Sequence, residues 1–130
     1  RAERSGFAKN IQPVMTLENV CELMGYAENV TAELSVRKYI LSLVTATRNS
    51  DYVKLGVSPR GSIALLKASK AYAFVQGRGF VMPDDVKAVM PDVLAHRLML
   101  SPKGKSAFEN ERKALENIAL TVKSPDAIEK

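Results

Sequence analysis

The chain has 130 residues, enough for one domain with a substantial core and too few for two. Hydrophobic residues make up 46% and charged residues 25%, as in globular proteins, and no apolar run approaches the roughly 18 residues of a membrane helix, so we expect no membrane insertion. The net charge of +5 raises the question of nucleic acid, but the basic residues are scattered and aromatic residues are only 6%, so we expect no specific nucleic-acid partner.

Cys21 is the only cysteine and His96 the only histidine, which excludes an internal disulfide and a metal site with several such ligands. Cys21 lies in a helical apolar pattern, so we expect it to be a small buried core residue in a reducing, cytoplasmic setting. Residues 1–13 hold few large apolar side chains, no signal-peptide core and no initiator Met. We expect them to form a linker or tail inside a larger protein.

The first predicted helix begins after Thr16, a good N-cap, and stops at Gly25. A second helix begins at residue 31 or 35 and ends at Arg48, where a cation suits the helix dipole. The spacing predicts that its buried face consists of Tyr39, Ile40, Leu43, Val44 and Thr47.

The third predicted helix has the clearest start signal, because Ser58 is a strong N-cap and Pro59 suits the first helical position. Gly77 is the glycine expected just beyond its C-terminus. Arg78 follows in a tight turn, and we expect its side chain to be solvated.

Pro83 opens a fourth helix, with Asp84 and Asp85 in the first turn as ordinary partners of the helix dipole. Pro91 is expected to interrupt this helix, and residues 98–100 fit a short strand. A last helix covers residues 107–122. About five helices with at most a minor extended segment predict an all-α helical bundle.

Arg60 is the residue that most needs an explanation. It would be the second residue of the third helix, where a cation opposes the positive end of the dipole, and Gly61 is a poor helix former beside it. Two residues that are unfavourable in a helix, Arg60 and Gly61, follow the Ser58 cap. Together they indicate a site where a helix N-terminus and a guanidinium hold phosphate. The alternative is a solvated arginine, or one paired with a carboxylate such as Asp51.

Two other features, a partial P-loop motif and the single histidine, do not form a nucleotide-binding or catalytic site. The letters GKS at 104–106 match the end of a P-loop, but the first glycine of that motif would have to be Met99, so the match is a coincidence. His96 is expected to pack or to hydrogen-bond near Arg97 at a helix end. No catalytic residues and no metal site can be assembled from this chain.

Six motifs follow one another along the chain: TATR (45–48), LGVSPR (55–60), ALLKA (64–68), GRGFV (77–81), PDDV (83–86) and DVLAHRL (92–98). In this order and spacing they resemble the C-terminal helical lid domain of MoxR-type AAA+ ATPases, over residues 14–122. The expected organisation is therefore a linker at 1–13, the lid at 14–123 and a tail at 124–130. Met82 and Gly61 depart from the pattern of the family, in which Thr and Ala are usual.

The resemblance implies that Arg60 is the sensor-2 residue, which reaches the phosphates of ATP with Mg²⁺ in the intact parent, with Ser58 and Gly61 beside it. It implies a hexameric ATPase that remodels or matures partner proteins, and as partners the ATPase core of the same chain, neighbouring subunits and an unidentified client. The Walker motifs and the arginine finger would belong to the core, so the fragment alone is expected to be inactive and to bind no cofactor tightly. The competing hypothesis is a non-enzymatic helical module that binds protein or, weakly, nucleic acid.

Overall fold

The computed structural model describes residues 10–125, and the expectations for residues 1–9 and 126–130 lie outside this range. In the described part, helices predominate and the extended segment is minor, which confirms the predicted all-α class. The elements are α2 (Leu17–Glu28), α3 (Leu34–Asn49), β1 (Val53–Leu55), α4 (Pro59–Val75), α5 (Pro83–Leu94), a 3₁₀ turn (Ala95–Arg97), β2 (Met99–Leu100), α6 (Pro102–Ala107) and α7 (Glu111–Thr121).

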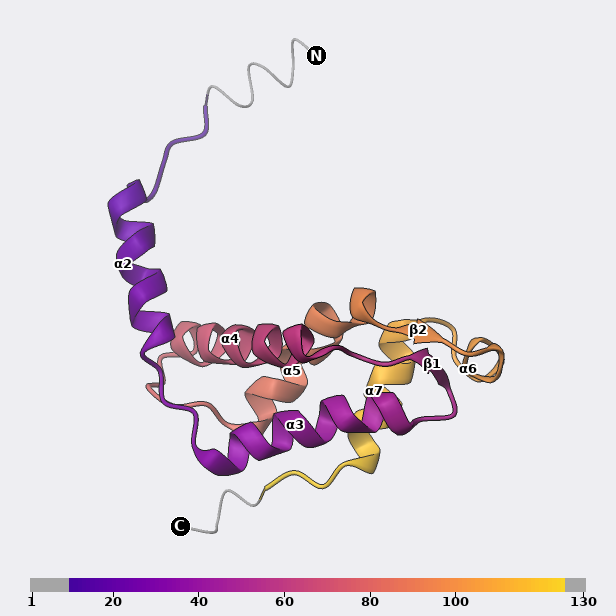
Figure 1. Ribbon diagram of the computed structural model, residues 1–130. Helices are drawn as coiled ribbons and strands as arrows, with labels where there is room; N and C mark the ends of the chain where they lie inside the picture. Colours follow the sequence, from indigo (N-terminus) through magenta and orange to yellow (C-terminus); the bar gives the residue numbers. More distant parts are fainter. Residues whose placement is uncertain (1–9, 126–130) are drawn as a thin grey trace.

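Helices α3, α4, α5 and α7 surround one core, while α2 projects away from it (Figure 1). Helix α4 packs most extensively on α5. The strands β1 and β2 pair antiparallel, with Val53 opposite Leu100, and close one end of the bundle. The largest side chains that are almost completely buried are Leu43, Leu65, Met90, Leu94 and Leu115.

The start of α2 is as predicted, but its end is not. Thr16 is the N-cap, and its side chain and that of Asn19 each accept a hydrogen bond from the other residue's backbone N–H. The helix continues through Gly25 to Glu28, where we expected it to stop. Stacking of Tyr26 on Phe74 of α4 holds this extra turn, which outweighs the low helix propensity of one glycine.

Helix α3 starts at Leu34, within one residue of Ser35, the later of the two expected positions, and not at Thr31. Thr31 instead forms a parallel bridge with Phe80, in which its N–H donates to the Gly79 carbonyl and its carbonyl accepts from the Val81 N–H. The predicted buried face of α3 is confirmed at all five positions: Tyr39, Ile40, Leu43, Val44 and Thr47.

Helix α4 matches its prediction at both ends. Ser58 is the N-cap residue and Pro59 the first helical residue, and Gly77 follows the helix with a φ of 82°. That left-handed conformation is favourable for glycine and strained for residues with a Cβ.

Two expectations further along the chain are wrong. Pro91 does not interrupt the fourth helix, because α5 runs through it to Leu94. Pro91 cannot donate a backbone hydrogen bond, but burial of Met90 and Leu94 on either side holds the helix continuous. The last predicted helix, residues 107–122, is α7, but it starts only after Asn110, whose side chain accepts from the Lys113 N–H; a separate short helix, α6, ends at Ala107.

Cys21 is exposed, which corrects the prediction of a buried core residue. Its apolar helical pattern is real, but α2 contributes no buried residue to the core. Among residues 10–125, no helix has both the length and the apolar content needed to cross a membrane.

Candidate functional site

Arg60 lies in the first turn of α4 with its side chain exposed to solvent. None of the ion pairs within residues 10–125 includes it. The carboxylate named as its alternative partner, Asp51, lies 3.9 Å from Lys103 instead. The guanidinium is therefore available to an anion from outside the described part of the chain.

Ser58 occupies the N-cap position, but its side chain makes no capping hydrogen bond. Pro59 has no N–H to donate, and the Gly61 N–H donates to the Ser58 carbonyl at 2.9 Å. Over residues 10–125, no acceptor is found for the Arg60 N–H or the Ser58 hydroxyl. The start of α4 thus keeps donors that an acceptor can use.

Gly61 is buried, and the structure gives it a packing reason. A Cβ at this position would stand 2.1 Å from Cγ1 of Val57 and 3.6 Å from Cδ of Arg97. The glycine lets the first turn of α4 lie directly on these two side chains. The absence of a side chain at position 61 is therefore explained without a ligand, and the argument for an anion site depends on Arg60 and Ser58.

Arg97 was not singled out from the sequence. Its side chain is half-buried against Gly61, and its Nε is buried with no hydrogen-bond partner among the described residues. The neighbouring His96 is exposed and makes no hydrogen bond within residues 10–125, which corrects the expectation that it packs or bonds. The last turn before β2 directs the two side chains differently, since the arginine reaches inward and the histidine outward.

The segment that leads into α4 is held by the end of α3. The Val57 N–H donates to Oγ1 of Thr47 at 3.1 Å, and Nε of Arg48 donates to the Val57 carbonyl at 2.8 Å. Gly56 passes so close to α3 that a Cβ there would lie 2.7 Å from the Cα of Arg48. Arg48 does close its helix as predicted, but it also positions the chain just before Arg60, a role that the sequence pattern did not indicate.

Three arginines therefore touch or belong to residues 57–61, and we call Arg48, Arg60 and Arg97 the arginine cluster. Within the described part of the chain, no carboxylate forms an ion pair with any of them. Positive charge without a carboxylate partner, beside a helix N-terminus, favours an anionic ligand.

Arg78 and Asp85 correct two expectations. Arg78 was expected to be solvated, and Asp85 to be an ordinary dipole partner, but they form a bidentate ion pair in which the aspartate is buried. Burial acts to raise the pKa of Asp85, yet hydrogen bonds from Arg78 and from the Met82 N–H outweigh it, so the pKa lies below its ordinary value. This pair fixes the turn between α4 and α5 and is structural.

The resemblance of residues 104–106 to a P-loop has no structural counterpart. Gly104 lies in α6, its N–H donates to Oγ of Ser101, and a Cβ on it would meet the Tyr52 carbonyl at 2.0 Å. A phosphate cradle needs free N–H groups in an open loop, so this segment cannot act as one. Within residues 10–125, no group of three or more acidic, cysteine or histidine side chains could hold a metal ion.

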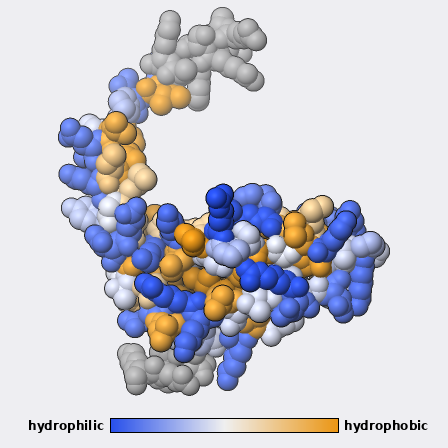
Figure 2. All heavy atoms as spheres, in the orientation of Figure 1, coloured by the Kyte–Doolittle hydropathy of each residue, from blue (hydrophilic) through white to orange (hydrophobic). Residues whose placement is uncertain are grey.

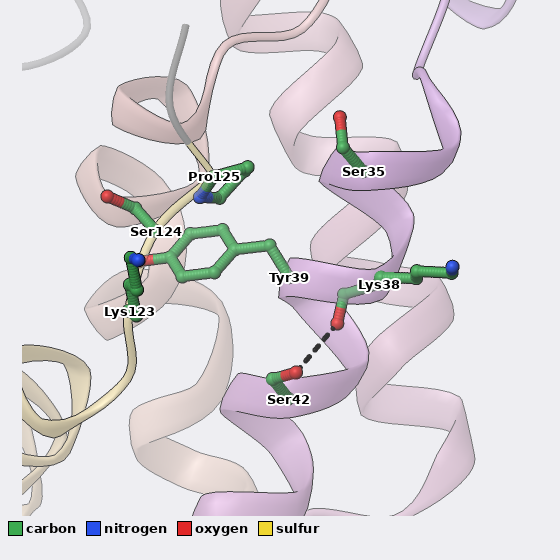
Figure 3. Close-up of a pocket in the computed structure, with 7 residues that line it drawn as sticks. All are labelled: Ser35, Lys38, Tyr39, Ser42, Lys123, Ser124 and Pro125. Carbon is green, nitrogen blue, oxygen red and sulfur yellow. Dashed lines mark hydrogen bonds between the residues drawn. The ribbon is translucent and has the colours of Figure 1, made fainter. Parts of the chain in front are cut away.

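A pocket of about 300 Å³ lies between α3 and the residues after α7 (Figure 3). Its lining residues are Ser35, Lys38, Tyr39, Ser42, Lys123, Ser124 and Pro125. The Tyr39 hydroxyl points toward residues 123–124, and burial, assisted by the charge of Asp84, raises its pKa. None of the site residues predicted from the sequence lines this pocket.

Comparison with known proteins gives consistent matches. Residues 45–118, more than half of the chain, match the family model described as the AAA lid domain. The chain is 40% identical over 123 residues to the uncharacterized protein YeaC of Bacillus subtilis and 38% identical over 104 residues to the protein MoxR of Paracoccus denitrificans. These alignments cover 95% and 70% of the chain but 38% and 30% of the relatives, so the chain spans well under half of their length.

Two further matches agree with these. The chaperone MoxR1 of Mycobacterium tuberculosis is 33% identical over 97 residues, which are 68% of the chain and 26% of that protein. A crystal structure of a Cytophaga hutchinsonii protein assigned as an ATPase superimposes with a TM-score of 0.70 at 32% identity, over 78% of the chain and 34% of its own.

Proposed function

Because the chain belongs to the AAA lid domain family, as the lid of a MoxR-type AAA+ ATPase, we propose that it couples ATP binding and hydrolysis in a larger parent to the remodelling or maturation of partner proteins. In this function Arg60 is the sensor-2 residue, which contacts the phosphates of the nucleotide. The lid itself supplies no catalytic residue.

The observation that carries the proposal is an exposed, unpaired guanidinium in the first turn of a helix. Arg60 opposes the helix dipole, which is unfavourable until an anion sits between the guanidinium and the helix end. Ser58 adds a hydroxyl without a capping bond, and Gly61 keeps the turn close to Val57 and Arg97. The donor set therefore fits a phosphate group of ATP, whose Mg²⁺ ligands and remaining contacts would come from the parent's core.

The rest of the arginine cluster supports this role in two ways. Arg48 positions the segment before Arg60, and Arg97 adds positive charge beneath the first turn. When the lid closes, Arg60 stabilises negative charge on the transferred phosphoryl group, and when it opens that contact is lost. Closure thereby links the state of the nucleotide to the position of the lid.

The parent is proposed to act as a hexamer in the cytoplasm, where each lid also passes its movement to a neighbouring subunit and through it to a client protein. Residues 14–123 form the lid, flanked by a linker at 1–13 and a tail at 124–130. The isolated chain is expected to hydrolyse no ATP, because the Walker motifs lie in the core.

The test is ATP turnover of the intact parent with Arg60→Ala and Arg60→Lys, and with Arg112→Ala as control. Arg112 is exposed on α7 and pairs with Asp92, and it does not belong to the arginine cluster. Loss of one transition-state donor lowers turnover by about a hundredfold or more, so Arg60→Ala should do so. Arg60→Lys should recover little, since an ammonium lacks the planar fork. Normal turnover in Arg60→Ala, with the control also normal, would refute the sensor role.

A further inference from the structure

The Tyr39 hydroxyl is a buried donor that no group in the described part of the chain uses. Tyr39 is 2% exposed, and its hydroxyl has no hydrogen-bond partner within residues 10–125. An unpaired buried hydroxyl is unfavourable, because the group loses its contact with water and gains no hydrogen bond in return. A phenylalanine would fill the same space in the core without this loss. The hydroxyl therefore calls for an explanation beyond packing.

The hydroxyl is directed at one wall of the pocket of about 300 Å³ described above, which we call the Tyr39 pocket. The Tyr39 ring extends from α3 toward residues 123–124, which lie on the opposite side of this pocket (Figure 3). All of the lining residues except Pro125 carry a hydroxyl or an ammonium group. The Ser42 hydroxyl donates to the Lys38 carbonyl, whereas no hydrogen bond within residues 10–125 engages the hydroxyls of Ser35 and Ser124. The pocket thus has donors on both of its walls.

The charge around the pocket is positive. Lys38 and Lys123 line it, and neither forms an ion pair within residues 10–125. The Lys38 side chain is turned away from Tyr39 in Figure 3, but both lysines are exposed and their four-carbon stems are flexible. Burial and, second to it, the charge of Asp84 raise the pKa of Tyr39, so the hydroxyl keeps its proton near neutral pH and can donate it to a hydrogen bond. This one carboxylate does not cancel two ammonium groups.

The surface around α3 differs in character from that of α2. Figure 2 shows exposed apolar side chains gathered along α2, whereas hydrophilic and hydrophobic side chains are mixed over α3. The volume of the Tyr39 pocket is at the lower end of the range, about 300–1,000 Å³, in which small molecules bind. A small polar molecule therefore fits this pocket better than an apolar segment of another protein.

We propose that the Tyr39 pocket binds a small ligand through a phosphate group, whose oxygens accept from the Tyr39 hydroxyl while Lys38 and Lys123 neutralise its charge. Phosphate suits these donors better than a carboxylate does, because it offers three acceptor oxygens and about two negative charges. Since the walls of the pocket are α3 and the segment after α7, a bound phosphate ties that segment to the bundle. This site goes beyond the proposed function, because none of the arginine cluster lines the pocket.

Inorganic phosphate is the probe, titrated into the isotope-labelled chain at constant ionic strength and followed by two-dimensional NMR. The backbone amide signals of Tyr39 and Lys123 should shift together and reach saturation. Tyr39→Phe should weaken this binding by about tenfold or more, the effect of one hydrogen bond to a charged group. Tyr26→Phe, at a 60% exposed tyrosine of α2, should leave it unchanged. Wild-type affinity in Tyr39→Phe would overturn the proposal.

A second pair of variants tests the charge. Lys123→Gln removes a cation from the pocket and should weaken phosphate binding, whereas Lys54→Gln, at an exposed lysine of β1, should not. An equal loss of affinity in both variants would show that phosphate responds only to the net charge of the chain, and would overturn the proposal.

Thermal melts give an independent readout of the hydroxyl. Without phosphate, Tyr39→Phe should be as stable as the wild type or more stable, since the hydroxyl lacks a partner. With phosphate the order should reverse, because only the wild type gains free energy from the binding. If Tyr39→Phe is less stable without phosphate, and phosphate does not raise the Tm of the wild type, then the hydroxyl has a partner within the protein and the proposal is wrong.

Two further measurements separate this site from its alternatives. Acetate should bind more weakly than phosphate by about tenfold or more, and equal affinities would overturn the assignment to a phosphate group. Arg60→Ala should leave the phosphate-dependent shifts of Tyr39 and Lys123 unchanged, and their loss would move the anion to the arginine cluster and overturn the proposal. Because no measurement here uses ATP turnover, failure of the sensor role of Arg60 would leave these results unaffected.

Discussion

Arg78 and Asp85 meet through two hydrogen bonds, with Nη1 2.6 Å from Oδ2 and Nη2 2.5 Å from Oδ1, and so join the turn after α4 to the first turn of α5. The Asp85 side chain is 3% exposed and that of Arg78 is 27% exposed. Asp85 also accepts from the Met82 N–H at 2.7 Å, which makes it the N-terminal anchor of α5. The pair is unequal, because only the arginine retains access to water.

This inequality predicts that Arg78→Met is more destabilising than Asp85→Asn. Arg78→Met leaves a buried carboxylate without its cation, and should cost on the order of 2–3 kcal/mol, below the roughly 3–5 kcal/mol of a fully buried pair. Asp85→Asn keeps an acceptor for the Met82 N–H and leaves the arginine able to reach water. Urea unfolding gives both free energies. Arg112→Met, at the exposed pair with Asp92, should cost less than about 1 kcal/mol, and a larger loss in Asp85→Asn than in Arg78→Met would contradict the prediction.

The lowered pKa of Asp85 predicts a loss of stability in acid. The folded state holds this pKa below the ordinary value of 3.8, so below about pH 4 the unfolded state binds the proton more readily. The stabilisation is therefore fully present above the unfolded pKa and is lost as the pH falls through the folded pKa. The difference in unfolding free energy between wild type and Asp85→Asn should stay constant from pH 7 to pH 5 and shrink below pH 4. A constant difference down to pH 2 would show that the charge of Asp85 contributes nothing.

Gly61→Ala should destabilise the chain, although alanine is normally better than glycine in a helix by about 1 kcal/mol. The added Cβ would stand 2.1 Å from Cγ1 of Val57, so the first turn of α4 must move, and overpacking of this kind typically costs about 1–3 kcal/mol. Gly25→Ala in α2 is the matched control, because no atom lies within 4 Å of its Cβ position, and it should be neutral or stabilising. Thermal melts of both variants give the comparison, and equal shifts of Tm would disprove the close contact at Gly61.

Thr47→Val should cost about 1–3 kcal/mol despite the similar shape of the two side chains. Thr47 is completely buried, and its hydroxyl accepts from the Val57 N–H while donating to the Val44 carbonyl at 2.6 Å. Valine would leave the Val57 N–H without a partner just before Arg60. Thr45→Val on the exposed side of the same helix should change stability by less than about 0.5 kcal/mol. Chemical unfolding measures the loss of stability in both variants. Equal losses would show that the Thr47 hydroxyl does not stabilise the fold.

Local signals were sufficient to predict several helix ends and the place of Arg60 in the fold. Thr16, Ser58 and Gly77 act on backbone groups within a few residues, so they mark helix ends whatever surrounds them. The same reasoning placed Arg60 in the first turn of α4, where the structure has it. Hydrophobic spacing likewise gave the buried face of α3.

Contacts between distant segments of the chain determine the features that local signals could not predict, which are helix continuity at Pro91, burial and ion pairing. Burial of Met90 and Leu94 carries α5 through Pro91, and the approach of Arg97 and Val57 explains Gly61 better than a ligand does. The spacing that predicted burial for Cys21 describes only one side of a helix, and whether that side is covered depends on what packs against it. Arg78 pairs with Asp85 because α5 brings the carboxylate to the turn. Capping and periodicity are properties of neighbours in the chain, whereas burial and charge pairing belong to neighbours in space, which the fold alone brings together.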